Sequence, residues 1–185
     1  LTTLVLVPQV VDTVKILVIA AGGIVDARGA VAAFALGAEA IQMGTRFLAT
    51  KESNAPAIYQ KLLLEAEEGD VPVFSKKYHP SRALRSPVVE QVLELEAADK
   101  PVDDIRNLIG RGRAKKAAHD GDLENGLFFA GTGAALVKDV VSVKELFDEM
   151  LAEYQDAVGR AGSMMHFGRP AVAATRAPGC RGRRH

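Results

Sequence analysis

Two short apolar runs, each ended by glycine, constrain the fold of this chain more than any other feature of its sequence. The run ILVIA (16–20) is followed by Gly22 and Gly23, and the run AEAIQM (38–43) is followed by Gly44. Neither run alternates polar with apolar residues, which is typical of strands buried on both faces of a parallel sheet. We therefore interpret both runs as buried strands that end in glycine turns.

A helical pattern lies before and between these strands. Residues 3–14 predict a helix with Pro8 in or near its first turn, and residues 27–37 predict a second helix. Asp26 is a candidate N-cap for the second helix, and Gly37 is its predicted C-terminal glycine. The order helix, strand, helix, strand predicts an α/β fold with parallel strands and right-handed crossovers.

The remainder of the chain is expected to be mostly helical. Its last predicted helix covers residues 142–158, and Ser142 and Glu145 have the spacing of a capping box. One apolar stripe is predicted to face inward on this helix, from Val143, Leu146, Phe147, Met150, Leu151 and Tyr154. The other segments expected to be helical are residues 54–68, 89–97, 103–110 and 123–137, the last after an opening turn.

Charge and cysteine content limit the classes of function. The net charge is zero, but residues 1–159 carry 17 of the 23 basic groups and all 23 acidic groups, a net charge of −6. This balance argues against a nucleic-acid surface on the body of the protein. Residues 159–185 form an Arg-rich tail that we expect to be disordered, with a basic binding arm as the alternative. A single cysteine, Cys180, and the lack of a membrane-length apolar run favour a cytoplasmic protein.

The two glycine turns suggest an anion site. Turns without side chains expose backbone N–H groups, and a helix that begins there favours negative charge. In (β/α)8 barrels, a phosphate site is often built from the loops after the seventh and eighth strands. One βα unit separates Gly23 from Gly44, as that geometry needs. The alternative is that both are ordinary tight turns.

At this point the sequence resembles a known family. AAGGI (20–24) followed by ALGAEAIQMGTRF (35–47) is similar to the nitronate monooxygenases, formerly 2-nitropropane dioxygenases. The flavin-dependent enoyl-acyl-carrier-protein reductases share this pattern. The resemblance covers roughly residues 1–158 and includes GRGRAKKA (110–117) and GDLENG (121–126). These proteins are FMN-dependent TIM barrels, so the resemblance implies that fold and that cofactor.

The resemblance also assigns regions and a cofactor site. It implies that residues 1–70 form the last βα units of an FMN-binding TIM (β/α)8 barrel, and that residues 71–158 form a helical and loop segment packed on it. The implied FMN phosphate cradle consists of Gly22, Gly23, Gln42, Met43, Gly44 and Thr45. Arg46 could add charge near the phosphate or lie on the surface. At Ala130-Gly131-Thr132 the family often has Ala-Gly-Gln, so the flavin contact of that glutamine is in doubt here.

Part of the family pattern is missing from these 185 residues. In the family, about six βα units precede the segment matching LTTLVLVPQVVD (1–12), and they carry a catalytic His on a Gly-Gly-His segment. The chain does not begin with Met, and none of its four His (79, 119, 166 and 185) follows a buried strand in a glycine-rich context. We therefore expect the C-terminal part of a barrel that is incomplete in this chain, with no catalytic residue assigned and no activity alone.

The expected function is that of an oxidoreductase. By resemblance, the whole enzyme oxidises alkyl nitronates with O₂ to a carbonyl compound and nitrite. One alternative is an NADH- and FMN-dependent enoyl-acyl-carrier-protein reductase, and another is a non-catalytic flavin-binding or interaction fragment. We expect a small-molecule substrate, no metal, no nucleic-acid or membrane partner, and we allow for a homo-oligomer.

Overall fold

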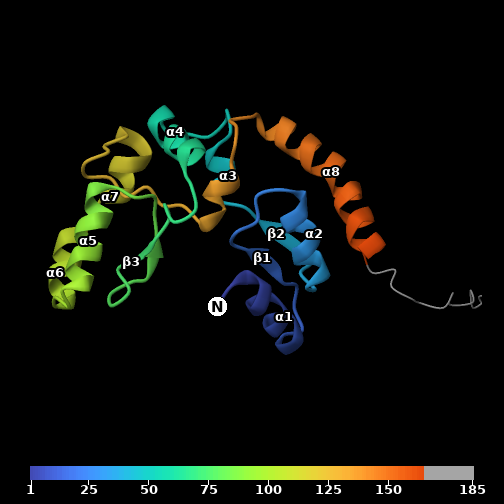
Figure 1. Ribbon diagram of the computed structural model, residues 1–185, viewed down its shortest axis with the longest axis horizontal. Coiled ribbons are helices and arrows are strands. Elements are labelled where there is room, and N and C mark those ends of the chain that lie inside the picture. Colours follow the sequence, from blue (N-terminus) through green and yellow to red (C-terminus); the bar gives the residue numbers. More distant parts are fainter. Residues whose placement is uncertain (165–185) are drawn as a thin grey trace, which may run out of the picture.

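A computed structural model of the chain describes residues 1–164 (Figure 1). Its first half follows the predicted order, with α1 (Thr3–Thr13), β1 (Ile19–Ala21), α2 (Ala27–Ala35) and β2 (Ala40–Gln42). β1 and β2 are parallel neighbours, with Ala20 opposite Ile41. The predicted helix-strand-helix-strand unit is therefore confirmed.

The two strands are shorter and more exposed than the apolar runs predicted. Residues 16–18 lie outside β1, and within β1 only Ala20 is buried. Ile19 is 60% exposed and Leu17 is 72% exposed. The expectation that both runs are buried on both faces is therefore wrong for residues 1–164, because the only strand paired with β1 is β2. Two parallel strands form no closed barrel within this part of the chain.

The middle of the chain forms a second body of short elements. It contains one antiparallel strand pair, β3 with β4, and otherwise helices. These elements are α3 (Thr45–Leu48), α4 (Ala57–Glu65), β3 (Val73–Phe74), β4 (Ser81–Arg82), α5 (Pro87–Ala97), α6 (Val102–Ile109), α7 (Arg113–Lys115), the π-helical turn η1 (Lys116–Asp120) and the 3₁₀ turn η2 (Thr132–Leu136). The helix expected over 123–137 is thus reduced to the five residues of η2.

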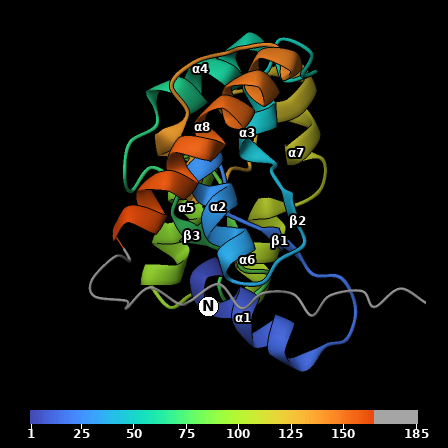
Figure 2. The same ribbon diagram turned by 90° about the vertical axis from the view of Figure 1, so that its right-hand side faces the viewer.

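The last helix, α8 (Val143–Met164), packs along α2 (Figure 2). Its predicted capping box is confirmed: the backbone N–H of Glu145 donates to Ser142 Oγ at 3.1 Å, and that of Ser142 donates to the Glu145 carboxylate at 2.7 Å. The helix continues six residues past its expected end at 158, so residues 159–164 are helical. The rest of the predicted disordered tail, with Cys180, His166 and His185, lies outside the described residues.

Three apolar clusters hold these elements together. One lies under α1, β1 and α2 and includes Val7 and Ala20. A second joins α4 to η2 and includes Leu63 and Phe128, and a third joins α5 to α6. In Figure 1 the chain forms an arch, with β1, β2 and α1 on one side, β3, α5 and α6 on the other, and α3 and α4 at the top. No helix within residues 1–164 is long and apolar enough to cross a membrane.

Candidate functional site

The first glycine turn follows β1 and exposes its backbone. Gly22 and Gly23 both adopt positive φ, +99° and +77°, which favours glycine over residues with a side chain. The Thr3 hydroxyl donates to the Gly22 carbonyl oxygen at 2.8 Å and holds the turn against α1. A Cβ added at Gly23 would meet no atom within 4 Å. The surface above Gly23 is therefore open to a ligand.

The second glycine turn follows β2 and is open in the same way. Gly44 is the N-cap residue of α3, is exposed, and has open space where a Cβ would stand. The side chain of Gln42 is exposed and makes no hydrogen bond to residues 1–164. Met43 instead packs against the apolar cluster under α1 and α2. Only its backbone is therefore placed to contribute to an anion site.

A third glycine segment, which sequence reasoning did not assign to the cradle, meets the other two. The Gly131 N–H donates to the Thr45 hydroxyl oxygen at 2.9 Å across 86 residues of sequence. A Cβ at Gly133 would lie 2.5 Å from Val25 Cγ2 and 3.7 Å from Gly23 Cα. The repeated glycines in AGTGAA (130–135) were the available signal, because only glycine allows so close an approach to the β1 turn.

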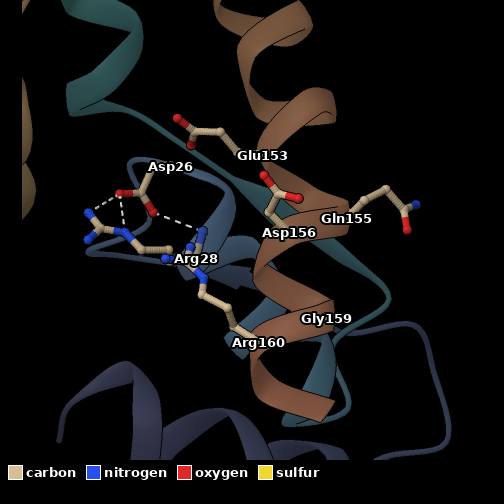
Figure 3. Close-up of a pocket in the computed structure, with 7 residues that line it drawn as sticks. All are labelled: Asp26, Arg28, Glu153, Gln155, Asp156, Gly159 and Arg160. Atoms are coloured by element: carbon tan, nitrogen blue, oxygen red, sulfur yellow. Dashed lines mark hydrogen bonds and ion pairs between the residues drawn. The ribbon is translucent and has the colours of Figure 1, made fainter. Parts of the chain in front are cut away.

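The N-terminus of α2 is not available for an anion, contrary to the expectation from sequence. Asp26 Oδ1 accepts the backbone N–H groups of Arg28 at 2.9 Å and Gly29 at 3.2 Å, and Asp26 also pairs with the Arg28 guanidinium (Figure 3). Partial burial raises the pKa of Asp26, but these hydrogen bonds outweigh it and leave the pKa below its ordinary value. The carboxylate therefore takes up two of the backbone N–H groups at the start of α2.

An open pocket of about 730 Å³ lies beside this ion pair, between the start of α2 and α8 (Figure 3). It is lined by groups of both charge signs, including Glu153, Asp156 and Arg160 from α8. The glycine turns do not line it. A phosphate would meet carboxylates there, so we do not place the cofactor in this pocket.

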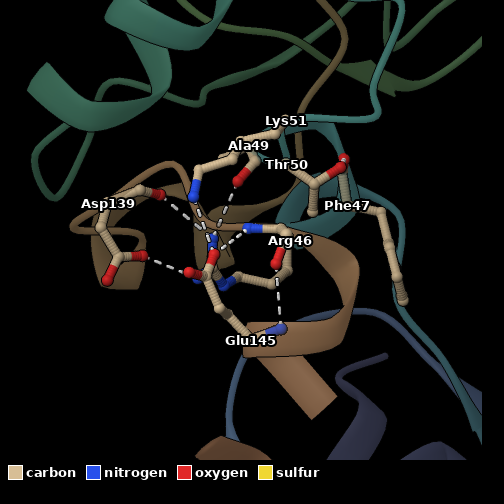
Figure 4. Close-up of polar contacts among 8 residues, drawn as sticks. Arg46, Phe47, Ala49, Thr50, Lys51, Asp139 and Glu145 are labelled. Atoms are coloured by element: carbon tan, nitrogen blue, oxygen red, sulfur yellow. Dashed lines mark hydrogen bonds and ion pairs between the residues drawn. The ribbon is translucent and has the colours of Figure 1, made fainter. Parts of the chain in front are cut away.

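Arg46 is buried in this structure and bound by groups of the protein. It is only 5% exposed, and its guanidinium donates to Asp139 Oδ1 at 2.7 Å and to the carbonyl oxygens of Ala49 and Asp139 at 3.2 Å (Figure 4). The interpretation of Arg46 as a surface residue is therefore wrong, and the interpretation that it adds charge near the phosphate stays a prediction. Its role is to tie α3 to the segment that leads into α8.

The two described histidines lie away from the glycine turns. His79 is exposed in the loop before β4, with Nδ1 3.1 Å from Ser81 Oγ, and His119 is exposed on η1. Within residues 1–164 no group of three or more His, Cys, Asp or Glu side chains could hold a metal ion. Neither described histidine therefore lies at the glycine turns as a candidate base.

Known proteins match this chain in sequence and in structure. A family model described as nitronate monooxygenase matches residues 1–153. A probable nitronate monooxygenase from Staphylococcus aureus is 42% identical over 125 residues, which are 66% of this chain and 34% of that protein. FabK from Thermotoga maritima aligns with a TM-score of 0.82 and 39% identity, over 89% of this chain and 52% of FabK.

A nitroalkane oxidase from Streptomyces ansochromogenes also aligns, with a TM-score of 0.68 and 28% identity over 87% of this chain and 46% of that protein. The chain thus spans about a third of the curated relatives it matches and about half of these solved structures. Since the family model covers most of the sequence, from Leu1 to Glu153, the chain belongs to the nitronate monooxygenase family.

Proposed function

We propose that this chain supplies the phosphate-binding part of an FMN-dependent nitronate monooxygenase. The observation that carries the proposal is the convergence of three glycine segments, 22–23, 44–45 and 131–133, around open backbone. The segments come from parts of the sequence up to about a hundred residues apart. Family membership supports the same assignment.

The residues present fit a phosphate group. Gly23 and Gly44 have open space where a Cβ would stand, so an anion can approach their backbone N–H groups. The Thr45 hydroxyl accepts a hydrogen bond from Gly131, which leaves its own hydrogen available to donate to a phosphate oxygen. Gln42 is exposed beside this turn with its amide unpaired by residues 1–164. Together these groups offer donors and no carboxylate.

In the proposed reaction of the whole enzyme, alkyl nitronates are oxidised with O₂ to a carbonyl compound and nitrite. Bound FMN supplies the redox chemistry in such enzymes. This chain's part is to fix the phosphate end of the cofactor and so to orient the rest of it. We further propose that the proton-transferring His belongs to βα units outside this chain, because neither His79 nor His119 lies at the glycine turns.

The proposal is tested by adding FMN to the purified 185-residue chain. We expect absorbance bands at about 370 and about 450 nm to remain with the protein after gel filtration, and the melting temperature to rise with FMN concentration. Absence of both effects would show that this chain does not form a phosphate cradle for FMN. Retention of riboflavin as strongly as FMN would show flavin binding without a phosphate contact.

The reaction is tested on the chain together with the barrel units it lacks. Nitrite release from a nitroalkane anion would support the monooxygenase, and NADH consumption with a crotonyl thioester would support the enoyl reductase instead. Flavin retention with neither activity would leave the non-catalytic flavin-binding alternative.

A further inference from the structure

The candidate phosphate site has two walls that are far apart in the sequence. One is α3, which begins at Thr45, and the other is the stretch 129–133, which carries Gly131. The walls meet where the Gly131 N–H donates to the Thr45 hydroxyl oxygen at 2.9 Å. α3 is only four residues long, and so short a helix is not stable without tertiary contacts. The distance between the walls therefore depends on the elements that hold them.

The second wall begins with a carbonyl group that the neighbouring backbone leaves free. Phe129 lies opposite Ala83 in an antiparallel bridge, and beside it the Leu84 N–H donates to the Phe128 carbonyl oxygen at 2.8 Å. In this register the carbonyl of Phe129 itself points away from the bridge. The hydroxyl of Tyr59 on α4 donates to that carbonyl oxygen at 2.5 Å. A side chain of α4 therefore takes the place of a backbone partner.

Tyr59 is held firmly enough to fix the position of this carbonyl. The residue is 4% exposed, and its ring packs edge-on against Phe128 with 5.0 Å between the ring centroids. Burial raises the pKa of Tyr59, so the hydroxyl keeps its proton and remains a donor at neutral pH. The stretch 129–133 is thus attached to α4 by a rigid and permanent donor.

The next residue of α4, Gln60, holds the first wall. Its side-chain amide donates to the carbonyl oxygen of Leu48 at 3.2 Å and to that of Thr50 at 2.9 Å. Leu48 is the last residue of α3, where helix carbonyls have no partner within the helix. α3 and α4 lie side by side at the top of the arch (Figure 1). Two consecutive residues of one helix, Tyr59 and Gln60, therefore hold both walls.

We propose that Tyr59 and Gln60 are positioning residues of the glycine site, which together fix the distance between Thr45 and Gly131. The inference rests on the proposed phosphate site and says how its geometry is maintained. Each of the two side chains acts through a backbone carbonyl and does not contact the phosphate. Without them the Gly131 N–H moves away from the Thr45 hydroxyl, which then loses the orientation needed to donate to a phosphate oxygen.

Tyr59→Phe and Gln60→Glu each remove one of these ties and keep the shape of the side chain. Phenylalanine lacks only the hydroxyl, and a glutamate carboxylate cannot donate to a carbonyl. The first measurement is amide hydrogen exchange of Gly131 by NMR in the flavin-free 185-residue chain. It is taken relative to the amide of Leu63 within α4, whose exchange reports the opening of that helix. We expect relative exchange at least about fivefold faster in both variants.

The second measurement is the preference for FMN over riboflavin, the ratio of their two Kd values. This preference should fall about fivefold to tenfold in both variants, through weaker FMN binding alone. The phosphorus NMR resonance of bound FMN should also move toward that of free FMN, because the phosphate loses an ordered donor. A loss of overall stability would weaken the binding of both flavins and leave their ratio unchanged.

Ile105→Val and Tyr78→Phe are the controls. Ile105→Val trims a fully buried side chain in the cluster of α5 and α6, so it lowers stability without contacting either wall. Tyr78→Phe removes the hydroxyl of a tyrosine that is 45% exposed and lies outside the glycine site. Both should leave the preference for FMN and the relative exchange of Gly131 unchanged.

The proposal is overturned if Tyr59→Phe and Gln60→Glu leave the relative exchange of Gly131 unchanged. It is also overturned if Ile105→Val lowers the preference for FMN as far as they do, or if a chain that prefers FMN keeps that preference in both variants. Equal binding of FMN and riboflavin by the unchanged chain would instead refute the phosphate site. Faster exchange of Gly131 in both variants would still support the roles of Tyr59 and Gln60 in that case.

Discussion

Substituting Gly44 by alanine gives a direct test of the phosphate cradle. Gly44 has φ −97° and ψ −67°, a conformation that alanine adopts without strain, and the added Cβ would meet no atom of the protein. The lower entropy of the unfolded chain favours alanine, whereas the N-cap position of α3 favours glycine. These effects oppose each other, so we expect the free energy of unfolding to change by less than about 1 kcal/mol.

The effect of Gly44→Ala on binding should be much larger. The Cβ would occupy the space in which a phosphate oxygen contacts the turn, and at least one hydrogen bond to a charged group would be lost. Such a hydrogen bond contributes about 1.5–3 kcal/mol, which corresponds to a roughly tenfold to hundredfold weaker Kd for FMN. Gly23 is less suitable for this test, because its φ of +77° would add backbone strain to the steric effect.

Fluorescence titration of FMN and of riboflavin into the same proteins separates the causes. Riboflavin has the flavin ring without the phosphate, so its Kd should change little in Gly44→Ala. Gly159→Ala is the control: it adds a methyl group to open space on α8, and both affinities should stay unchanged. If Gly44→Ala binds FMN as tightly as the unchanged chain does, the phosphate does not lie at this turn.

Three further predictions concern the framework of the site. Thr45→Val removes the acceptor of the Gly131 N–H and should lower the free energy of unfolding in urea by about 1–2 kcal/mol. Thr45→Ser keeps the hydroxyl and should lower it by less than half of that. Equal losses in the two variants would contradict the role of the hydroxyl. Asp139→Ala leaves the buried Arg46 with carbonyl partners only and should lower the free energy of unfolding by about 1–2 kcal/mol. This loss is smaller than for a fully buried ion pair, because 55% of the Asp139 side chain is exposed. An unchanged unfolding midpoint would refute the prediction. Lys51 and the Ser142 cap lower the pKa of Glu145 to about 2. The stabilising effect of the Glu145 carboxylate is therefore complete above about pH 4.5 and is lost as the pH falls through about 2. An NMR titration midpoint near 4.5 would contradict the capping box.

Local signals predicted local structure well. Asp26 capped α2, Gly37 followed its end with φ +96°, and Ser142 with Glu145 formed the capping box of α8. Each of these features depends on groups within three or four residues of one another. A sequence pattern therefore specifies them without knowledge of the fold.

The features that failed prediction depend on distant partners. A surface position was one expectation for Arg46, but the residue is buried with an ion-pair partner 93 residues away. The close approach of Gly133 to Gly23 likewise arises only from the fold. The apolar run at 16–20 correctly predicted a strand, but not its burial. Burial of both faces needs neighbouring strands and helices that residues 1–164 do not supply. The division of the chain at residue 70 stays a prediction.

The contacts between α3 and the start of α8 have a consequence for how this protein can vary. Thr50 bridges to Val141, the Lys51 N–H donates to the Val141 carbonyl oxygen at 2.9 Å, and Arg46 pairs with Asp139. The two ends of residues 51–140 therefore meet beside α3, and these residues form a long loop closed at its base. Doubling the length of such a closed loop costs only about 0.6 kcal/mol of chain entropy, so its outer part is free to change in length. The stretch that returns to α3 is not free to change in length, because Gly131 and Gly133 on it contact the two glycine turns.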